Sequence, residues 1–281
     1  MYGIAVALVL GSGFFHSVWN LYTKKSIDKN VFLWCCQAVA IVVFLPWTIL
    51  DWEGGSLTAA GCLIILASMA LHGLYVRLLA AAYAAGDMSQ VYPIMRGTSP
   101  LLVPLLGAAL LGERLTLIGW MGVVTIVIGM AALSHTGFRR RQSDRRAPML
   151  ALAVGICISS YIVVDKIALD HVSPIVLNEL TNVGNLLALS LTAIRSEGIA
   201  REIRAGWRTI LLGGVLAPGA YILFLFALAL APAAQLAPMR EIGTVFGTVL
   251  AVGILRERQG ARRIAASLLI TAGIVVLGIW G

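Results

Sequence analysis

The sequence predicts an all-α membrane protein with ten transmembrane helices, arranged as two inverted five-helix repeats. Three observations support this fold class: the apolar composition, ten apolar segments of spanning length, and residues that recur between the two halves. Of the 281 residues, 59% are hydrophobic and only 12% are charged, and the mean hydropathy is +0.92. A soluble fold needs polar residues for its solvated surface, whereas a lipid bilayer accepts apolar ones, so a membrane protein is predicted.

Ten apolar segments have the length that a bilayer crossing needs, which is about 20 residues. Each is apolar on most of its faces, unlike the amphipathic helices of soluble proteins. The first, at 2–22, is expected to be a retained span because it lacks the basic start and the cleavage site of a leader. The others are predicted at 31–50, 58–84, 88–111, 115–135, 147–169, 173–194, 208–230, 233–254 and 261–280.

The two halves of the chain share residues at nearly constant spacing. An offset of 144 aligns Met95-Arg96 with Met239-Arg240, Glu113-Arg114 with Glu257-Arg258, and Gly129 with Gly273; an offset of 142 aligns Trp19 with Tyr161, Lys24 with Lys166, and Asp28 with Asp170. Matches in this order predict a duplicated unit, with repeats at 1–135 and 148–281 and a basic cytoplasmic linker at 136–147. Five spans are an odd number, so the second repeat is inverted, as in many secondary transporters.

The distribution of basic residues predicts the orientation. With the linker placed inside, one side of the membrane receives Arg114 alone, next to the acidic Asp51 and Glu53. The positive-inside rule then places both termini on the outer side of the plasma (inner) membrane. The basic residues on the inner side are Lys24, Lys25, Lys29, Arg139, Arg140, Arg141, Arg145, Arg146, Arg195, Arg201, Arg204, Arg208, Arg256, Arg258, Arg262 and Arg263.

Several classes of function do not fit the residues. The net charge of +8 comes from loop residues without interleaved aromatic residues, so no nucleic-acid binding is expected. The four cysteines have no metal-ligand spacing, and neither a metal nor another cofactor is expected. The sequence contains neither a GxSG nor an HExxH motif, so no enzyme is expected. The expected partners are the lipid bilayer, a small-molecule substrate and a candidate coupling proton; a monomer suffices for this architecture, and a dimer is compatible with it.

Two arginines are the main candidates for substrate binding. Arg96 and Arg240 each lie about eight residues into a predicted span, and a buried Arg at a span centre costs about 2.5–3.5 kcal/mol. Two such costs at equivalent positions of inverted repeats favour a shared central cavity, where guanidinium groups bind a carboxylate or phosphate. The alternative is that each arginine only satisfies a neighbour, such as Glu241 for Arg240.

Further cavity residues are predicted from helical spacing. His16, Trp19 and Asn20 share one face of the first span. Although a lone histidine is more often a satisfied core residue, a stripe of three polar or aromatic residues favours a cavity lining. The aromatic candidates Tyr92, Tyr161 and Tyr221 complete the predicted substrate site.

Buried acids are the candidates for coupling to a proton. Glu179 lies on the seventh span with Asn178, Asn182 and Asn185, and an interhelical hydrogen-bond seam is the equally weighted alternative there. Glu241 and Asp165 are the other coupling candidates, although Asp165 and Lys166 could instead extend to the outer interface. His72 and Arg77 are further polar groups within or near the membrane. Glu113 and Glu257 are predicted to anchor helix ends.

The motifs that contain these residues resemble the EamA group of the drug/metabolite transporter superfamily over essentially the whole chain. They are HSVWN (16–20), VYPIMRGTSPLLVP (91–104), GER (112–114), APMRE (237–241) and RER (256–258). The resemblance implies a secondary carrier that works by alternating access, and related members export amino acids, metabolites or drugs. Sugar-phosphate translocators of the superfamily bind phosphate through basic residues on the fourth and ninth helices, which Arg96 and Arg240 match by position. Well-described members have their N-terminus inside, in contrast to the charge count here.

These observations together predict transport of a small anionic or zwitterionic metabolite, of the amino acid, organic phosphate or phosphonate class. Two alternatives stay open. A proton-coupled exporter of cationic drugs would need a cavity carboxylate, for which Glu179 is the candidate. A flippase for lipid-linked intermediates is usually a shorter, single-unit chain, so the fused ten-span chain favours it less.

Overall fold

The computed structural model describes residues 1–23, 27–52, 57–86, 88–134, 146–196, 198–253 and 261–281. These residues form eleven α-helices and no strand. The helices are α1 (Tyr2–Thr23), α2 (Lys29–Asp51), α3 (Ala59–Ala85), α4 (Met88–Leu110), α5 (Leu117–Ser134), α6 (Arg146–Ala168), α7 (Pro174–Arg195), α8 (Ile199–Leu230), α9 (Ala233–Met239), α10 (Ile242–Gly253) and α11 (Ala261–Trp280). The all-α class is therefore confirmed.

Local chemistry explains where several helices begin. The carboxylate of Asp28 accepts hydrogen bonds from the backbone amides of Asn30 and Val31 and so caps α2. The Thr58 hydroxyl caps α3 through the amide of Gly61. Ser173 caps α7, where Pro174 occupies the first helical position and needs no donor. These side chains satisfy amides that the first helical turn leaves unpaired.

The predicted ninth span is interrupted, which corrects the prediction of a continuous helix over 233–254. The α9 helix ends at Met239 and α10 begins at Ile242, so Arg240 and Glu241 form a turn between them. Pro238, near the end of α9, has no amide hydrogen to donate to the preceding turn. The amide of Glu241 instead bonds to the Pro238 carbonyl at 3.1 Å, three residues back. The break places Arg240 on irregular backbone inside the bundle.

The eighth helix also differs from its prediction. The α8 helix begins at Ile199, nine residues before the predicted start of 208, and it bends at Gly206, where φ is −138° and ψ is 24°. Its first part is rich in charged residues, so a hydropathy pattern alone assigned this part to a loop. The remaining predicted spans each coincide with one helix, with differences of a few residues at their ends.

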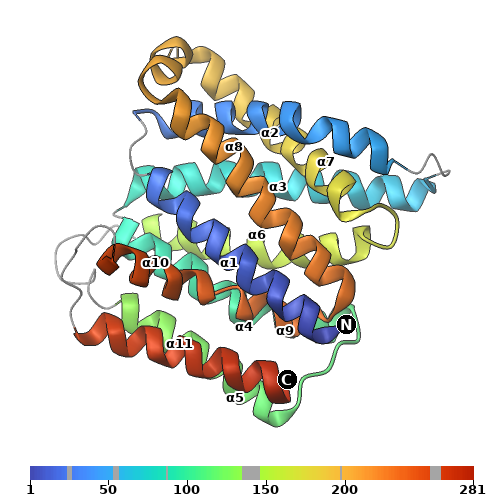
Figure 1. The fold of residues 1–281 in the computed structure, drawn as a ribbon, viewed down its shortest axis with the longest axis vertical. Helices are drawn as coiled ribbons and strands as arrows, with labels where there is room; N and C mark the ends of the chain where they lie inside the picture. The colour runs from blue at the N-terminus through green and yellow to red at the C-terminus, as the bar shows by residue number, and fades with distance from the viewer. Residues whose placement is uncertain (24–26, 53–56, 87, 135–145, 197, 254–260) are drawn as a thin grey trace.

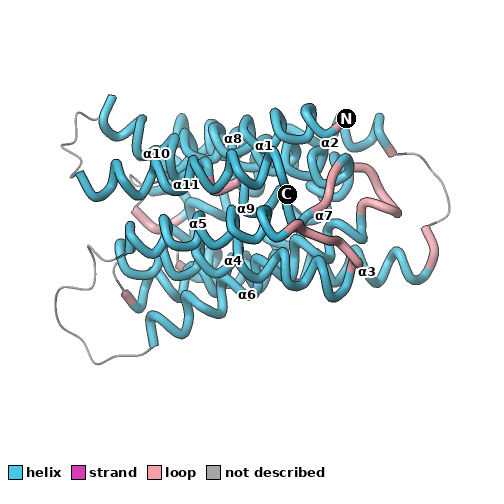
Figure 2. The backbone as a smooth tube through the Cα atoms, turned by 90° about the horizontal axis from the view of Figure 1, so that it is seen from below, coloured by secondary structure: helices cyan, strands magenta, loops and turns pink. Residues whose placement is uncertain are grey.

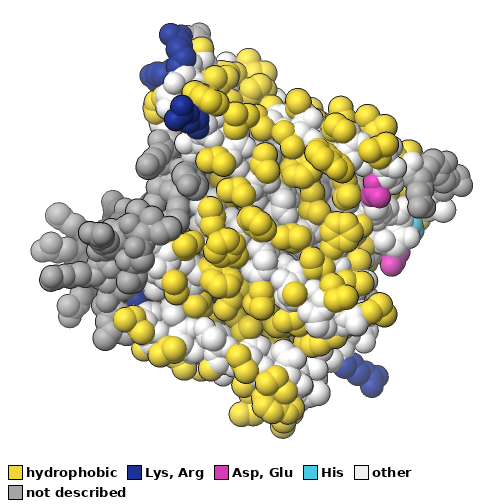
Figure 3. All heavy atoms as spheres, viewed as in Figure 1, with side chains coloured by type: hydrophobic (Ala, Val, Ile, Leu, Met, Phe, Trp, Pro, Cys, Tyr) yellow, Lys and Arg dark blue, Asp and Glu magenta, His cyan; other side chains and the backbone are white. Residues whose placement is uncertain are grey.

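The exposed surface has the character of a membrane protein. Six helices of the described chain are long and apolar enough to cross a membrane, and shorter apolar stretches occur at Ile94–Leu110 and Leu117–Leu133. Figure 3 shows exposed apolar side chains over most of the visible face, while Lys and Arg gather mainly at one end and Asp and Glu at the other. An apolar surface with Lys and Arg mainly at one end is what the positive-inside rule expects of a bilayer-embedded bundle.

The helices form a bundle in which sequence-distant segments are neighbours (Figure 1). The α5 helix packs against α11 at one edge, and α2 packs against α7 towards the opposite edge. Between them, α1 contacts α8 and α10, while α6 contacts α3 and α4. Both chain termini lie towards the same end of the bundle (Figures 1 and 2).

Glycines allow the α5–α11 pair to approach closely. A Cβ atom at Gly273 would lie 2.7 Å from the carbonyl oxygen of Gly122, and one at Gly129 would lie 2.7 Å from Cγ1 of Ile270. Small residues at such contacts are the usual means of helix association in membranes. Cys35, Cys36, Cys62 and Cys157 are all free thiols.

Candidate functional site

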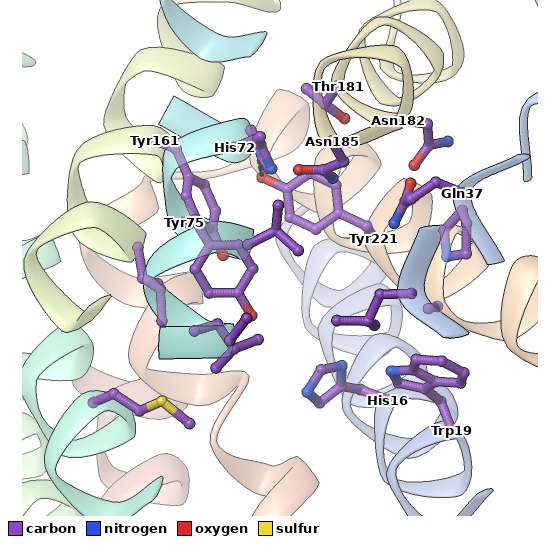
Figure 4. A pocket seen from close by; sticks show the side chains of 18 of the residues that line it. His16, Trp19, Gln37, His72, Tyr75, Tyr161, Thr181, Asn182, Asn185 and Tyr221 are labelled. Carbon is purple, nitrogen blue, oxygen red and sulfur yellow. Dashed lines mark hydrogen bonds between the residues drawn. The ribbon is translucent and has the colours of Figure 1, made fainter. Parts of the chain in front are cut away.

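A central cavity of about 380 Å³ lies between the helices of both halves. Its walls come from α1, α2, α3, α4, α6, α7 and α8, together with Arg240 from the α9–α10 break. It extends to Lys29 and Tyr83, at the first turn of α2 and the last turn of α3, where the Lys29 ammonium lies 5.1 Å from the ring centroid. Figure 4 shows its aromatic and amide side chains. The cavity therefore reaches the end of the bundle at which α2 starts.

Arg96 lines this cavity and is neutralised by an acid from the other half of the chain. Its Nε lies 3.3 Å from Oε2 of Glu241, and both side chains are nearly buried. The Arg96 guanidinium also lies 5.9 Å from the ring centroid of Tyr92, a further lining residue. The sequence suggested Glu241 as a partner for Arg240, whereas the structure pairs it with Arg96.

Arg240 lines the same cavity without an acidic partner. Only 7% of the residue is exposed, and among the described residues it forms no salt bridge and its Nε has no hydrogen-bond partner. The guanidinium carbon lies 4.4 Å from the Phe224 ring centroid and 5.2 Å from that of Tyr221. Cation–π contacts offset part of the cost of burial, but they leave the hydrogen-bond donors free for an anion.

The first helix contributes an aromatic and an imidazole group. His16 and Trp19 both line the cavity (Figure 4). Trp19 is held by stacking on Phe32 of α2, with ring centroids 5.6 Å apart and an interplanar angle of 9°. Asn20 belongs to α1, but its side chain lies outside the described part of the structure. Two of the three residues of the predicted stripe therefore face the cavity.

Four rings form the wall opposite α1 and α2. His72 and Tyr161 have centroids 4.1 Å apart, Tyr75 lies 5.5 Å from Tyr161, and Tyr221 lies 5.3 Å from His72. All four line the cavity and are labelled in Figure 4. They come from α3, α6 and α8. Tyr75 was not predicted as a site residue; its spacing of three residues from His72 on one helix face is the signal that could have found it.

Asp165 is fully buried, which corrects the interpretation that it extends to the outer interface. Its carboxylate accepts hydrogen bonds from Ser68 Oγ at 2.5 Å and from Tyr221 Oη, and it lies 2.9 Å from His72 Nε2. Lys166 is likewise engaged inside the protein, where it donates to the carbonyls of Leu228 and Ala231. The sequence of α6 could not predict these contacts, because their partners lie on α3 and at α8, far away in the chain.

Amide groups form a third wall. Gln37 of α2 and Asn178, Asn182 and Asn185 of α7 line the cavity, and each has a buried polar atom without a hydrogen-bond partner. Figure 4 shows Gln37 and Asn182 on the same side of the Tyr221 ring. Unpaired buried amides are costly, which favours a polar ligand in this space. Glu179, the coupling candidate beside them, is buried with both carboxylate oxygens unpartnered, and it is not part of the lining.

The end of the bundle beyond Arg240 is closed by polar contacts between the halves. The carboxylate of Glu113 accepts hydrogen bonds of 2.8 Å from the backbone amides of Ala233 and Ala234 at the start of α9. This anchoring of a helix end is the role predicted for Glu113. Its predicted counterpart Glu257 lies outside the described residues. The described residues contain no group of three or more His, Cys, Asp or Glu that could hold a metal ion.

The comparison with protein families decides the identity. Residues 145–279 match the family described as "EamA-like transporter family". This part of the chain is an EamA domain. The resemblance of the sequence to EamA-type transporters of the drug/metabolite superfamily is thereby confirmed for the second half of the chain, and the protein is a multi-pass membrane protein.

The fold of the whole chain also occurs in solved structures. One chain, from a structure titled "Crystal structure of protein", is 16% identical and superposes with a TM-score of 0.82 over 99% of both chains. At this identity the likeness shows a shared fold over the whole chain. No curated protein sequence matches it.

Proposed function

We propose that this EamA protein is a secondary transporter that carries a small anionic or zwitterionic metabolite across the plasma membrane by alternating access. The substrate class is that of amino acids, organic phosphates and phosphonates. The observation that carries the proposal is Arg240, a buried guanidinium that has no acidic partner among the described residues, on a cavity that both halves of the chain build. A free guanidinium fork in a low-dielectric cavity is a binding site for a carboxylate, phosphonate or phosphate.

Paired contacts support an architecture of two inverted repeats, at 1–135 and 148–281, with the 136–147 linker between them. The α1–α8 contact has its counterpart in α6–α3, and the α1–α10 contact in α6–α4. Ser17 donates to the carbonyl of Gly13 at 2.8 Å, and Ser159, at the offset that relates Trp19 to Tyr161, donates to that of Gly155 at the same distance. With the α9–α10 pair counted as one interrupted span, the chain crosses the membrane ten times.

The two ends of the cavity support alternating access. At one end the cavity reaches Lys29 and Tyr83. At the other end Glu113 joins the two halves through the start of α9, and Lys166 holds α6 to the end of α8 within the second half. The charge bias assigns the first end, with its many basic residues, to the inner side of the membrane. In the proposed cycle this conformation is the inward-open one, and transport requires the contact of Glu113 between the halves to separate while the inner end closes. Both termini lie outside in this arrangement.

A thermal-shift screen of the purified chain tests the substrate class. A ligand at 100 times its Kd stabilises the folded protein by about 2.7 kcal/mol, so binding of a carboxylate, sulfonate, phosphonate or phosphate raises Tm, whereas a cationic dye does not. In Arg240→Gln the anion-dependent rise in Tm disappears. Arg77→Gln is the matched control, because Arg77 lies on α3 outside the cavity lining; it retains the response.

Uptake into proteoliposomes then tests transport by the same variants. Anion uptake that Arg240→Gln abolishes and Arg77→Gln preserves supports the proposal. Equal uptake by both variants contradicts the assignment of Arg240. Stabilisation by cationic dyes alone would favour the exporter of cationic compounds instead.

A further inference from the structure

Asp165 is the centre of a hydrogen-bonded cluster that the anion site does not use directly. Ser68 and His72 on α3 and Tyr221 on α8 all contact its carboxylate on α6. Asp165 is 0% exposed and His72 is 5% exposed. His72 lines the cavity, so one face of this cluster meets the space where the substrate binds. The cluster is thus a buried titratable pair at the cavity wall.

One tyrosine connects this pair to Arg240. The Arg240 guanidinium carbon lies 5.2 Å from the Tyr221 ring centroid, and the hydroxyl of the same ring donates to Asp165. The charge of Arg96 is already matched by Glu241. Arg240 and Asp165 are therefore the opposite charges that remain on this wall, separated by the ring of Tyr221.

This arrangement makes anion binding depend on a proton. A substrate anion at Arg240 brings a second negative charge close to Asp165 in a cavity where uncompensated charge is costly. A proton on the His72–Asp165 pair removes that cost, because the imidazolium offsets the carboxylate and leaves Arg240 to the substrate. Binding of the proton then strengthens binding of the anion, and binding of the anion strengthens binding of the proton by the same free energy.

The pair does not belong to the framework that the two repeats share. The repeat offset of 144 places Leu216, which cannot titrate, opposite His72. Titratable and charged groups from several helices line the cavity together with His72: His16, Lys29, Tyr75, Tyr83, Tyr92, Arg96, Tyr161, Tyr221 and Arg240. Asp165, Glu179 and Glu241 are buried and do not belong to this lining. Of these residues, two lie within hydrogen-bond distance of the His72 ring: Asp165 and Tyr221.

We propose that His72 and Asp165 together form the proton-binding site of the transporter, and that each substrate anion is carried with one proton. This inference rests on the proposed function, in which an anion occupies the cavity at Arg240. The proton comes from water at the open end, binds the imidazole of His72, which donates through Nε2 to Asp165, and leaves to water after the opposite end has opened. A monoanion then moves without net charge, and no covalent bond of the substrate changes.

Benzenesulfonate is a suitable probe because it stays a monoanion throughout the pH range used. We expect its Kd for the full chain, measured by calorimetry between pH 5.5 and 8, to fall as the pH falls, by up to about tenfold per pH unit for one linked proton. Binding in weakly buffered solution takes up close to one proton per protein on the steep part of this profile. In Asp165→Asn, whose side chain mimics the protonated acid, and in His72→Gln, both the pH dependence and the proton uptake disappear.

His16→Gln and Glu179→Gln are the controls, since these residues are the other titratable candidates near the cavity. Both retain the pH dependence, whatever their affinity. Loss of the slope in either control, or an unchanged slope in both His72→Gln and Asp165→Asn, overturns the assignment. If Asp165→Asn does not fold, His72→Gln decides alone. Wild-type binding that is independent of pH contradicts only the proton linkage, whereas no binding of benzenesulfonate at any pH contradicts the anion site itself.

Discussion

Arg96 and Glu241 form a salt bridge of 3.3 Å that joins α4 in the first half of the chain to the α9–α10 break in the second. Arg96 and Arg240 occupy equivalent positions of the repeats, but only the second is followed by an acid, because Gly97 takes the place of Glu241 in the first half. Glu241 reaches across to Arg96 rather than binding its neighbour. One guanidinium is thereby neutralised and the other is left for a substrate.

Glu241→Gln tests this asymmetry. Removing one partner of a buried ion pair leaves an uncompensated charge and typically costs about 3–5 kcal/mol, so we expect a large drop in Tm. In the Arg96→Gln/Glu241→Gln double variant the charge of Arg96 is removed as well. The loss of stability in this variant is smaller than the sum of the losses in the Arg96→Gln and Glu241→Gln single variants. Thermal unfolding of the wild type, the two single variants and the double variant gives the coupling energy between the two side chains. Strict additivity would show that the two side chains do not interact.

Glu113→Ala tests the contact at the closed end. The variant removes the carboxylate that accepts from the amides of Ala233 and Ala234, and loss of such a cap costs about 0.5–2 kcal/mol. Hydrogen exchange at these two amides is expected to rise selectively. Arg114→Ala, which changes the exposed neighbouring residue, is the matched control and leaves their protection intact. Equal protection in Glu113→Ala would exclude the capping role.

Gly273→Val tests the close approach of α5 and α11. A Cβ at this position meets the Gly122 carbonyl oxygen at 2.7 Å, so the helices must move apart at a cost of about 1–3 kcal/mol. We expect a lower Tm and a lower yield of folded protein in detergent. Gly247→Val on α10 is the control, because a Cβ there has no neighbour within 4 Å. A comparable loss in both variants would point to helix propensity rather than packing.

Cysteine labelling tests the orientation. In a background in which the exposed Cys62 is replaced by Ala, Asp170→Cys and Arg201→Cys each place one thiol at an exposed position. Asp170 precedes α7 and Arg201 lies in the first turn of α8, so the two thiols are at opposite ends of α7. With the N-terminus outside, a membrane-impermeant maleimide added to intact cells labels Asp170→Cys but not Arg201→Cys. The reverse pattern would place both termini inside.

Much of the fold follows from local sequence properties. The helix positions depend on runs of apolar residues and on caps such as Asp28 and Ser173, which act within a few residues of their own position. The break at Arg240 was missed because Pro238 alone does not decide between a kink and an interruption of the helix. The early start of α8 was missed because its first part is charged and lies outside the apolar run.

The candidate site was predictable only in part. Arg96, Arg240, His16, Trp19 and the three tyrosines could be selected because polar and aromatic groups in apolar spans are unusual. Their partners could not be selected, since the salt bridge of Arg96 and the cluster around Asp165 join residues far apart in the chain.

The sequence by itself determined that this protein is helical and lies in a membrane, because hydropathy and charge distribution are properties of the residues in their order along the chain. Only the tertiary structure decided which buried charges compensate each other. Electrostatic energy in a low-dielectric interior depends on distances of a few ångströms between side chains. Those distances are set when α4, α6 and α8 pack around the α9–α10 break, and no spacing along the chain contains them.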